Sequence, residues 1–164
     1  MSNFCTNQAE RHVVFKSINA TFSPKHFHNF SITIKNNTVN MDMYIIRPLR
    51  RGYMAHLEYQ MRLANAKLFQ TIFSNKFDIC NTVGSLKESI IKYWFKTMLK
   101  NGNFMQNCPV EVGHYYLHNW QMAVTHRFLQ PAEYRCIART YYGKYKSKTE
   151  DHVITFQIEA ELMN

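Results

Sequence analysis

Hydrophobic and polar residues alternate along most of this chain, which is the period expected for a β-strand that buries one face. The alternation is clearest over residues 39–45 and 53–63, where every second side chain is apolar. Weaker forms of the same pattern predict further strands over residues 12–22, 30–35, 69–80, 112–122, 134–145 and 153–162. About eight strands joined by short turns predict a mainly β fold, an antiparallel sandwich or barrel.

Residues 85–100 break the alternation and predict one amphipathic helix. Ser85 and Glu88 form a capping box at its start, and Lys100 is followed by a glycine stop at Gly102. A narrow basic stripe consists of Lys92, Lys96 and Lys100. Apolar residues fill most of the remaining circumference, an arc wider than packing on one sheet face requires. Two interpretations stay open: a helix buried on two sides, and a helix that rests at a lipid interface.

The length of 164 residues fits one domain, which we expect over residues 12–164 after an N-terminal tail at residues 1–11. A hydrophobic fraction of 46% supplies enough material for a core, or for a core and an apolar cavity. The net charge of +9 is spread along the chain, with small clusters at Arg47–Arg51 and Lys144–Lys148. Both clusters fall in predicted turns and neither contains a nucleic-acid motif, so we expect no nucleic-acid partner.

Three N-glycosylation sequons lie close together, at Asn19, Asn29 and Asn36. Together with the cysteines they favour a secreted, extracellular glycoprotein. The first thirty residues lack the apolar segment of a signal peptide, which indicates a mature chain with an added start methionine or a trimmed sequence. No apolar run approaches the roughly 18 residues that a membrane span needs.

The four cysteines permit three disulfide connectivities, and the sequence alone does not choose between them. We favour Cys80–Cys108, because this pair closes the helical segment between two predicted strands. Cys5–Cys136 then follows by elimination. None of the four lies in a Cys-x-x-Cys motif, so a zinc site is not expected.

Catalytic motifs are missing from the sequence. It contains no Gly-x-Ser-x-Gly elbow, no phosphate-binding glycine loop and no His-Glu-x-x-His motif, so we expect neither an enzyme nor a cofactor. His26 with His28, and His114 with His118, are spaced to share a strand face, but without a third ligand we expect no metal site. Asp78 stands among apolar residues, where its carboxylate is expected to bind nearby backbone or an arginine, with ligand recognition as the alternative.

A segment running from strand to helix to strand resembles a known family. The matching residues are Asp78, Cys80, Asn103, Phe104, Cys108, Pro109, Gly113, His114, Tyr115 and Tyr116. In this spacing they resemble an insect family of small secreted proteins that is catalogued only as a domain of unknown function. That family is distantly similar to the CheB chemosensory proteins of flies, and to the ganglioside-activator and ML-type lipid-recognition proteins. The resemblance implies secretion, a disulfide-tied β-sandwich cup (ML- or immunoglobulin-like) and an apolar ligand, which some members present to a receptor or channel in taste or pheromone sensing.

We therefore expect a secreted, non-enzymatic protein that binds a lipid or other apolar molecule between its sheets, as a chemosensory accessory protein. The candidate cavity residues are Met41, Met43, Ile45, Leu57, Tyr59, Met61, Ile90, Trp94, Met98, Trp120, Phe156 and Ile158. Lys92, Lys96 and Lys100 are the candidates for contact with a headgroup or membrane surface. An ordinary core remains open for the cavity residues. The alternative functions are an extracellular protein–protein interaction module with a filled core, and an activator that presents lipid to a separate hydrolase.

Overall fold

The computed structural model describes residues 11–83, 96–103, 108–122 and 129–164. Its strands are β1 (His12–Phe22), β2 (Phe27–Lys35), β3 (Thr38–Ile45), β4 (Met54–Arg62), β5 (Gln70–Asp78), β6 (Gly113–Trp120), β7 (Ala132–Tyr142) and β8 (Asp151–Met163). A short helix, α1 (Ile79–Val83), follows β5. The predicted mainly β fold is confirmed, with eight antiparallel strands among the described residues.

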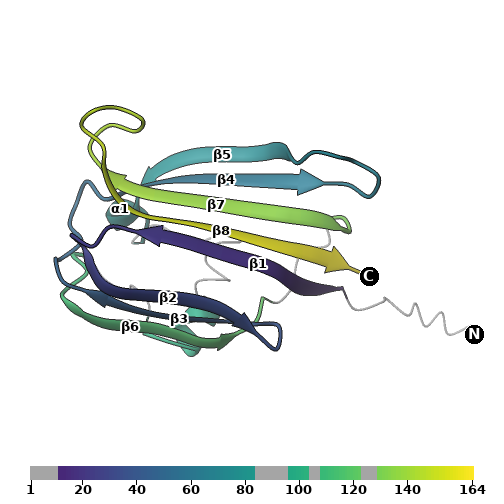
Figure 1. Cartoon of the computed structure of the whole chain (residues 1–164), viewed down its shortest axis with the longest axis horizontal. Helices are drawn as coiled ribbons and strands as arrows, with labels where there is room; N and C mark the ends of the chain where they lie inside the picture. Colours follow the sequence, from purple (N-terminus) through teal and green to yellow (C-terminus); the bar gives the residue numbers. More distant parts are fainter. Residues whose placement is uncertain (1–10, 84–95, 104–107, 123–128) are drawn as a thin grey trace, which may run out of the picture.

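The strands form two sheets. One has five strands in the order β1-β8-β7-β4-β5, and the other has three in the order β2-β3-β6. β1 and β2 are edge strands of different sheets, and they lie side by side where the sheets meet (Figure 1). The sheets are therefore joined along the β1/β2 edge, and β5 and β6 lie at their far edges.

The core lies between the three-stranded sheet and the β1/β8 part of the larger sheet. The alternation in β3 buries Val39, Met41, Met43 and Ile45, which have 1–6% of their surface exposed. They pack in one cluster with Phe15 of β1, Leu117 and Trp120 of β6, and Val153 and Ile154 of β8. Period-2 patterning thus predicts the buried face of β3 correctly, because successive strand side chains point to opposite faces.

The strand predicted over residues 69–80 begins one residue before β5 and runs two residues past its end, because β5 stops at Asp78 and the chain turns into α1. Asp78 Oδ1 accepts a hydrogen bond from the backbone N–H of Asn81 at 3.1 Å, as an N-cap residue does. Its Oδ2 accepts another from the N–H of Gly52, also at 3.1 Å. The expectation that this carboxylate binds nearby backbone is confirmed.

The helix predicted over residues 85–100 lies mostly outside the described residues, but residues 96–100 are helical. This turn contacts the core through Met98, and Trp120 Nε1 donates to Thr97 Oγ1 at 3.0 Å. Lys96 and Lys100 are exposed, so the described lysines of the predicted stripe do face solvent.

Gly102 lies where the segment after this helical turn pairs with Leu117 of β6. A Cβ atom added there would overlap the backbone carbonyl oxygen of Tyr116. We expect Gly102→Ala to lower the free energy of unfolding by about 1–3 kcal/mol, because backbone cannot yield as a flexible side chain does. Urea denaturation measures this. Gln121→Ala, at an exposed position, is the control, and equal stability of the two variants would contradict the packing argument.

Candidate ligand-binding site

The inner face of the five-stranded sheet is packed unequally. The buried cluster draws its strand residues from β1, β2, β3, β6 and the start of β8. Leu57, Tyr59 and Met61 of β4 and Phe156 of β8 do not belong to it among the described residues, and each is half-buried. The three-stranded sheet therefore covers the β1/β8 side of this face more fully than the β4 side.

Strand register aligns these half-buried residues in rows. Leu57 is paired with Ala138 of β7, which is paired with Phe156 of β8. The next row runs from Tyr59 through Cys136 to Ile158. Because residues opposite one another on antiparallel strands share a face, the rows form an apolar strip across β4, β7 and β8. We call Leu57, Tyr59, Met61, Phe156 and Ile158 the inner strip.

The outer face of the same sheet is polar, and arginines on it pair with carboxylates. The inner strip therefore lies on the opposite face, toward the three-stranded sheet. Arg135 pairs with Glu159 at 2.8 Å and Arg139 with Glu150 at 2.8 Å, while Arg62 pairs with Glu133. The Arg135 guanidinium also lies 3.9 Å from the centre of the Phe69 ring. On the outer face each of the three arginines named therefore has a carboxylate partner.

The cysteines follow the predictions only in part. The Cys80–Cys108 disulfide is confirmed, with a Cα–Cα distance of 5.3 Å. The predicted Cys5–Cys136 pair is wrong, because Cys136 is a free cysteine; Cys5 lies outside the described residues. Cys136 faces inward opposite Tyr59, and burial raises the pKa of its thiol to about 11. The thiol is therefore protonated and serves in packing. Pairing by elimination gave this cysteine a disulfide partner because it assumed that all four cysteines form bridges.

The predicted cavity residues separate into three groups. Met41, Met43, Ile45 and Trp120 lie in the packed core. Leu57, Tyr59, Met61, Phe156 and Ile158 form the inner strip, and Met98 and Ile158 also pack against the core's edge. Ile90 and Trp94, like Lys92, lie outside the described residues.

The sequon asparagines are all exposed. Asn19 lies on β1, Asn29 on β2 and Asn36 in the turn between β2 and β3. Glycans at these positions would surround the edge where the sheets meet and would leave the β4/β5 side uncovered. Glycosylation itself stays a prediction.

The histidine pairs differ from each other. His114 and His118 share a face as predicted, and both contact the carboxylate of Asp42, at 2.8 and 3.1 Å. His26 is buried whereas His28 is exposed, so this second pair does not share an environment. Among the described residues no group of three potential ligands is arranged to hold a metal ion.

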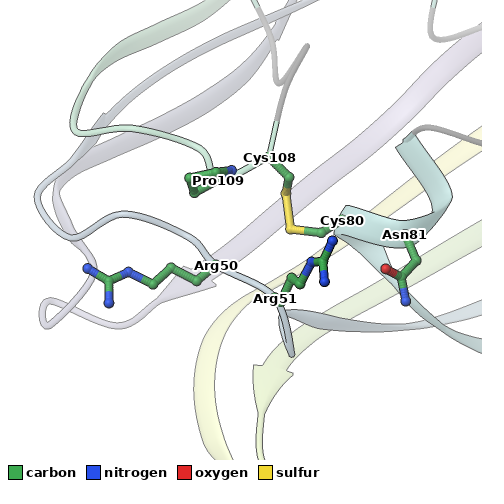
Figure 2. A pocket seen from close by; sticks show the side chains of 6 residues that line it. All are labelled: Arg50, Arg51, Cys80, Asn81, Cys108 and Pro109. Carbon is green, nitrogen blue, oxygen red and sulfur yellow. A yellow bond between two sulfur atoms is a disulfide. The ribbon is translucent and has the colours of Figure 1, made fainter.

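Two adjoining pockets at the disulfide end of the sandwich were missed by the sequence reasoning. The first, of about 360 Å³, is lined by Arg50, Arg51, Cys80, Asn81, Cys108 and Pro109 (Figure 2). The second, of about 470 Å³, is lined by Lys25, His26, Arg47, Pro48, Arg50, Arg51, Tyr142 and Asp151. The signal in the sequence is the Arg47–Arg51 cluster, for which the sequence predicts a turn and no nucleic-acid motif.

Burial lowers the pKa of His26, His56 and His152 below the ordinary histidine value, because it disfavours the charged imidazolium. As the pH falls through about 6.5, the unfolded chain therefore binds protons before the folded protein does. We expect the free energy of unfolding to decrease between about pH 7.5 and 5.5, since protons then favour the unfolded state. Urea denaturation across this range measures the effect.

A matched pair of variants tests the cause of this pH dependence. His26→Phe removes one of the three groups and should flatten the curve, whereas His28→Phe removes an exposed imidazole and serves as the control. Stability that rises as the pH falls through this range would contradict the assignment.

No helix among the described residues is long and apolar enough to cross a membrane.

Comparison with known proteins gives a family without an assigned activity. No curated protein matches the chain. Residues 55–136, half of the chain, match the family described as "Protein of unknown function (DUF1091)". This segment runs from β4 through the disulfide to the middle of β7, and it contains Leu57, Tyr59 and Met61 of the inner strip. The chain therefore belongs to the DUF1091 family.

Proposed function

We propose that this protein binds a lipid or other apolar small molecule on the inner face of its five-stranded sheet, and that it has no catalytic activity of its own. One observation carries the proposal. The inner strip is apolar and inward-facing, yet its side chains are only half-buried beside a tightly packed core. Apolar surface with few polar groups is the usual lining of a small-molecule site.

The energetics favour an elongated hydrocarbon. Removing apolar surface from water contributes about 0.8 kcal/mol per methylene group, so a chain of ten methylenes gains on the order of 8 kcal/mol before the costs of association. Met61 and Tyr59 suit such a ligand, because methionine adapts its shape and tyrosine offers a broad apolar ring.

Other features support an extracellular carrier that sequesters its ligand and presents it to a receptor, a channel or a membrane surface. The disulfide is typical of proteins from oxidising compartments. The exposed sequons agree with passage through a secretory pathway. A chemosensory accessory role, as in the similar fly proteins, is the form of this function that we propose.

Protein–protein interaction is the second candidate, and a different surface favours it. Exposed apolar side chains lie on β5 and in the turn before it: Leu63, Leu68 and Ile72 have 47–78% of their surface exposed. β5 is an edge strand, whose unpaired backbone groups can accept another strand.

The test is displacement of a fluorescent fatty-acid probe from protein secreted by insect cells, together with native mass spectrometry for co-purified lipid. Leu57→Gln and Met61→Gln are each expected to weaken probe binding by about tenfold, because each places an amide against the hydrocarbon. Ile137→Gln makes the same change on the opposite face of the sheet, where Ile137 pairs with Glu58, and should have no effect.

Two results would count against the proposal. One is wild-type protein that carries no lipid and binds no apolar probe. The other is an equal loss of binding in Ile137→Gln and Leu57→Gln, which would indicate a general effect on folding.

A further inference from the structure

The turn between β3 and β4 presents a cluster of cations at the disulfide end of the sandwich. Arg47, Arg50 and Arg51 are all exposed, and with Lys25 they line the two adjoining pockets. Arg50 and Arg51 border both pockets, and Figure 2 shows their side chains leaving the turn in different directions. The two pockets thus form one basic depression, which we call the arginine pocket.

The backbone of this turn is firmly held. Leu49 is buried and exchanges two backbone hydrogen bonds with Val110, at 2.9 and 2.8 Å. The N–H of Arg50 donates to the Tyr142 hydroxyl at 2.9 Å, and the N–H of Tyr53 donates to the Arg50 carbonyl at 3.1 Å. The backbone that carries these arginines is therefore held before any ligand arrives, which reduces the ordering cost of binding.

Positive charge in the arginine pocket is largely uncompensated. Its acidic lining residue, Asp151, pairs with Lys25 at 2.8 Å. Within the part of the chain that the structure describes, the guanidinium groups of Arg47, Arg50 and Arg51 make no hydrogen bond and no ion pair. This contrasts with Arg62, Arg135 and Arg139 on the outer face of the large sheet, each of which has a carboxylate partner.

A buried histidine at the same place lacks hydrogen bonds. His26 is 5% exposed, lines the arginine pocket and stacks on Tyr142 with ring centres 5.8 Å apart. Neither Nδ1 nor Nε2 has a hydrogen-bond partner, and Nε2 stays 3.6 Å from the Asp151 carboxylate. Leaving a buried polar group unsatisfied costs about 1–3 kcal/mol, so native proteins rarely do so without a ligand or water.

From this geometry we infer that the arginine pocket binds a phosphate or sulfate group. Guanidinium forks match the oxygens of such an anion, and several of them together favour a multiply charged group over a single carboxylate. His26 lines the same pocket, and its buried ring N–H is an unpartnered donor beside the arginines. Two sources carry this chemistry, the headgroup of an anionic lipid and a free anion. The inference does not depend on the apolar ligand proposed above.

Calorimetric titration with inorganic phosphate at low ionic strength tests the site. The variant R47Q/R50Q/R51Q should bind phosphate at least about tenfold more weakly than wild type, because charge-assisted hydrogen bonds are lost. The control K144Q/K146Q/K148Q removes the same number of charges from the turn between β7 and β8 and should bind normally. Equal weakening in both variants, or no phosphate binding by wild type, would overturn the inference.

His26→Phe tests the histidine separately. Phenylalanine keeps the ring stack on Tyr142 and the burial but removes the N–H donor, so the fold should persist while phosphate affinity falls severalfold. Circular dichroism verifies folding. Unchanged affinity in a folded His26→Phe protein would refute the role given to His26.

Vesicle sedimentation separates the two sources. Protein is mixed with phosphatidylcholine vesicles that contain phosphatidic acid, or that lack it. Binding only to the anionic vesicles, reversed by millimolar phosphate and lost in R47Q/R50Q/R51Q, would support the site with a lipid headgroup as its source. Phosphate binding in calorimetry without vesicle binding would support the site with a free anion. Vesicle binding that survives in R47Q/R50Q/R51Q would overturn the pocket as the headgroup site.

Discussion

Replacing Trp120 by alanine is expected to lower the free energy of unfolding by about 3–5 kcal/mol, the range found for large aromatic side chains in a core. Trp120 is 2% exposed, and its ring lies 6.0 Å from that of Phe15 across the two sheets. It also donates to Thr97, which ties the helical turn at residues 96–100 to β6. Loss of this side chain removes the packing of β6 against β1 across the two sheets. Urea denaturation followed by circular dichroism measures the effect.

Two further variants test whether the loss of stability comes from burial of the Trp120 ring and from its hydrogen bond. Leu68→Ala removes a side chain that is 78% exposed and should change stability by no more than about 0.5 kcal/mol. Trp120→Phe keeps most of the ring but loses the hydrogen bond to Thr97, so it should fall between wild type and Trp120→Ala. A Trp120→Ala protein as stable as Leu68→Ala would show that the core does not depend on this residue.

Removing the disulfide with the double variant Cys80→Ser, Cys108→Ser is expected to cost about 3–4 kcal/mol. The two cysteines are 28 positions apart, and the chain-entropy estimate for a loop of this size gives that value. The disulfide also joins α1 to the segment that pairs Val110 with Leu49, so its loss should loosen the arginine pocket as well. Denaturation with and without reductant provides the measurement.

Cys136 supplies the control for this experiment. Because it is a free cysteine, Cys136→Ala should remain as sensitive to reductant as wild type, whereas the double variant should not respond to reductant at all. A wild-type protein that loses no stability under reducing conditions would refute the stabilising role of Cys80–Cys108.

The strands were predictable because a half-buried strand alternates apolar and polar residues, and this alternation shows which face is buried. The segment 12–22 was predicted with the observed bounds of β1. β3 deviates from the prediction by one residue at its start, and β4 by one residue at each end. The end of β5 was missed because Asp78 stops the strand through hydrogen bonds to Asn81 and Gly52. Gly52 is distant in sequence, so no local pattern contains this information.

The candidate sites were predictable to different degrees. Alternation identified Leu57, Tyr59 and Met61 as inward-facing, but it did not separate them from Met41 and Met43 in the packed core. That difference depends on which part of the large sheet the small sheet covers. Cys136 was misassigned for a similar reason, because pairing by elimination ignores the side chain that lies opposite on the next strand.

What the sequence by itself determined is the set of strands and their inward faces, since both arise from spacing along the chain. It favoured the Cys80–Cys108 closure but did not choose it, and the structure shows that bridge. What only the tertiary structure decided is the environment of each face. The arginine pocket combines Arg47–Arg51 with His26 and Tyr142, which are distant in sequence and meet because strand ends from both sheets converge at one end of the sandwich. Side-chain periodicity reports burial on a face, whereas a site depends on which faces and loops the sheet order brings together.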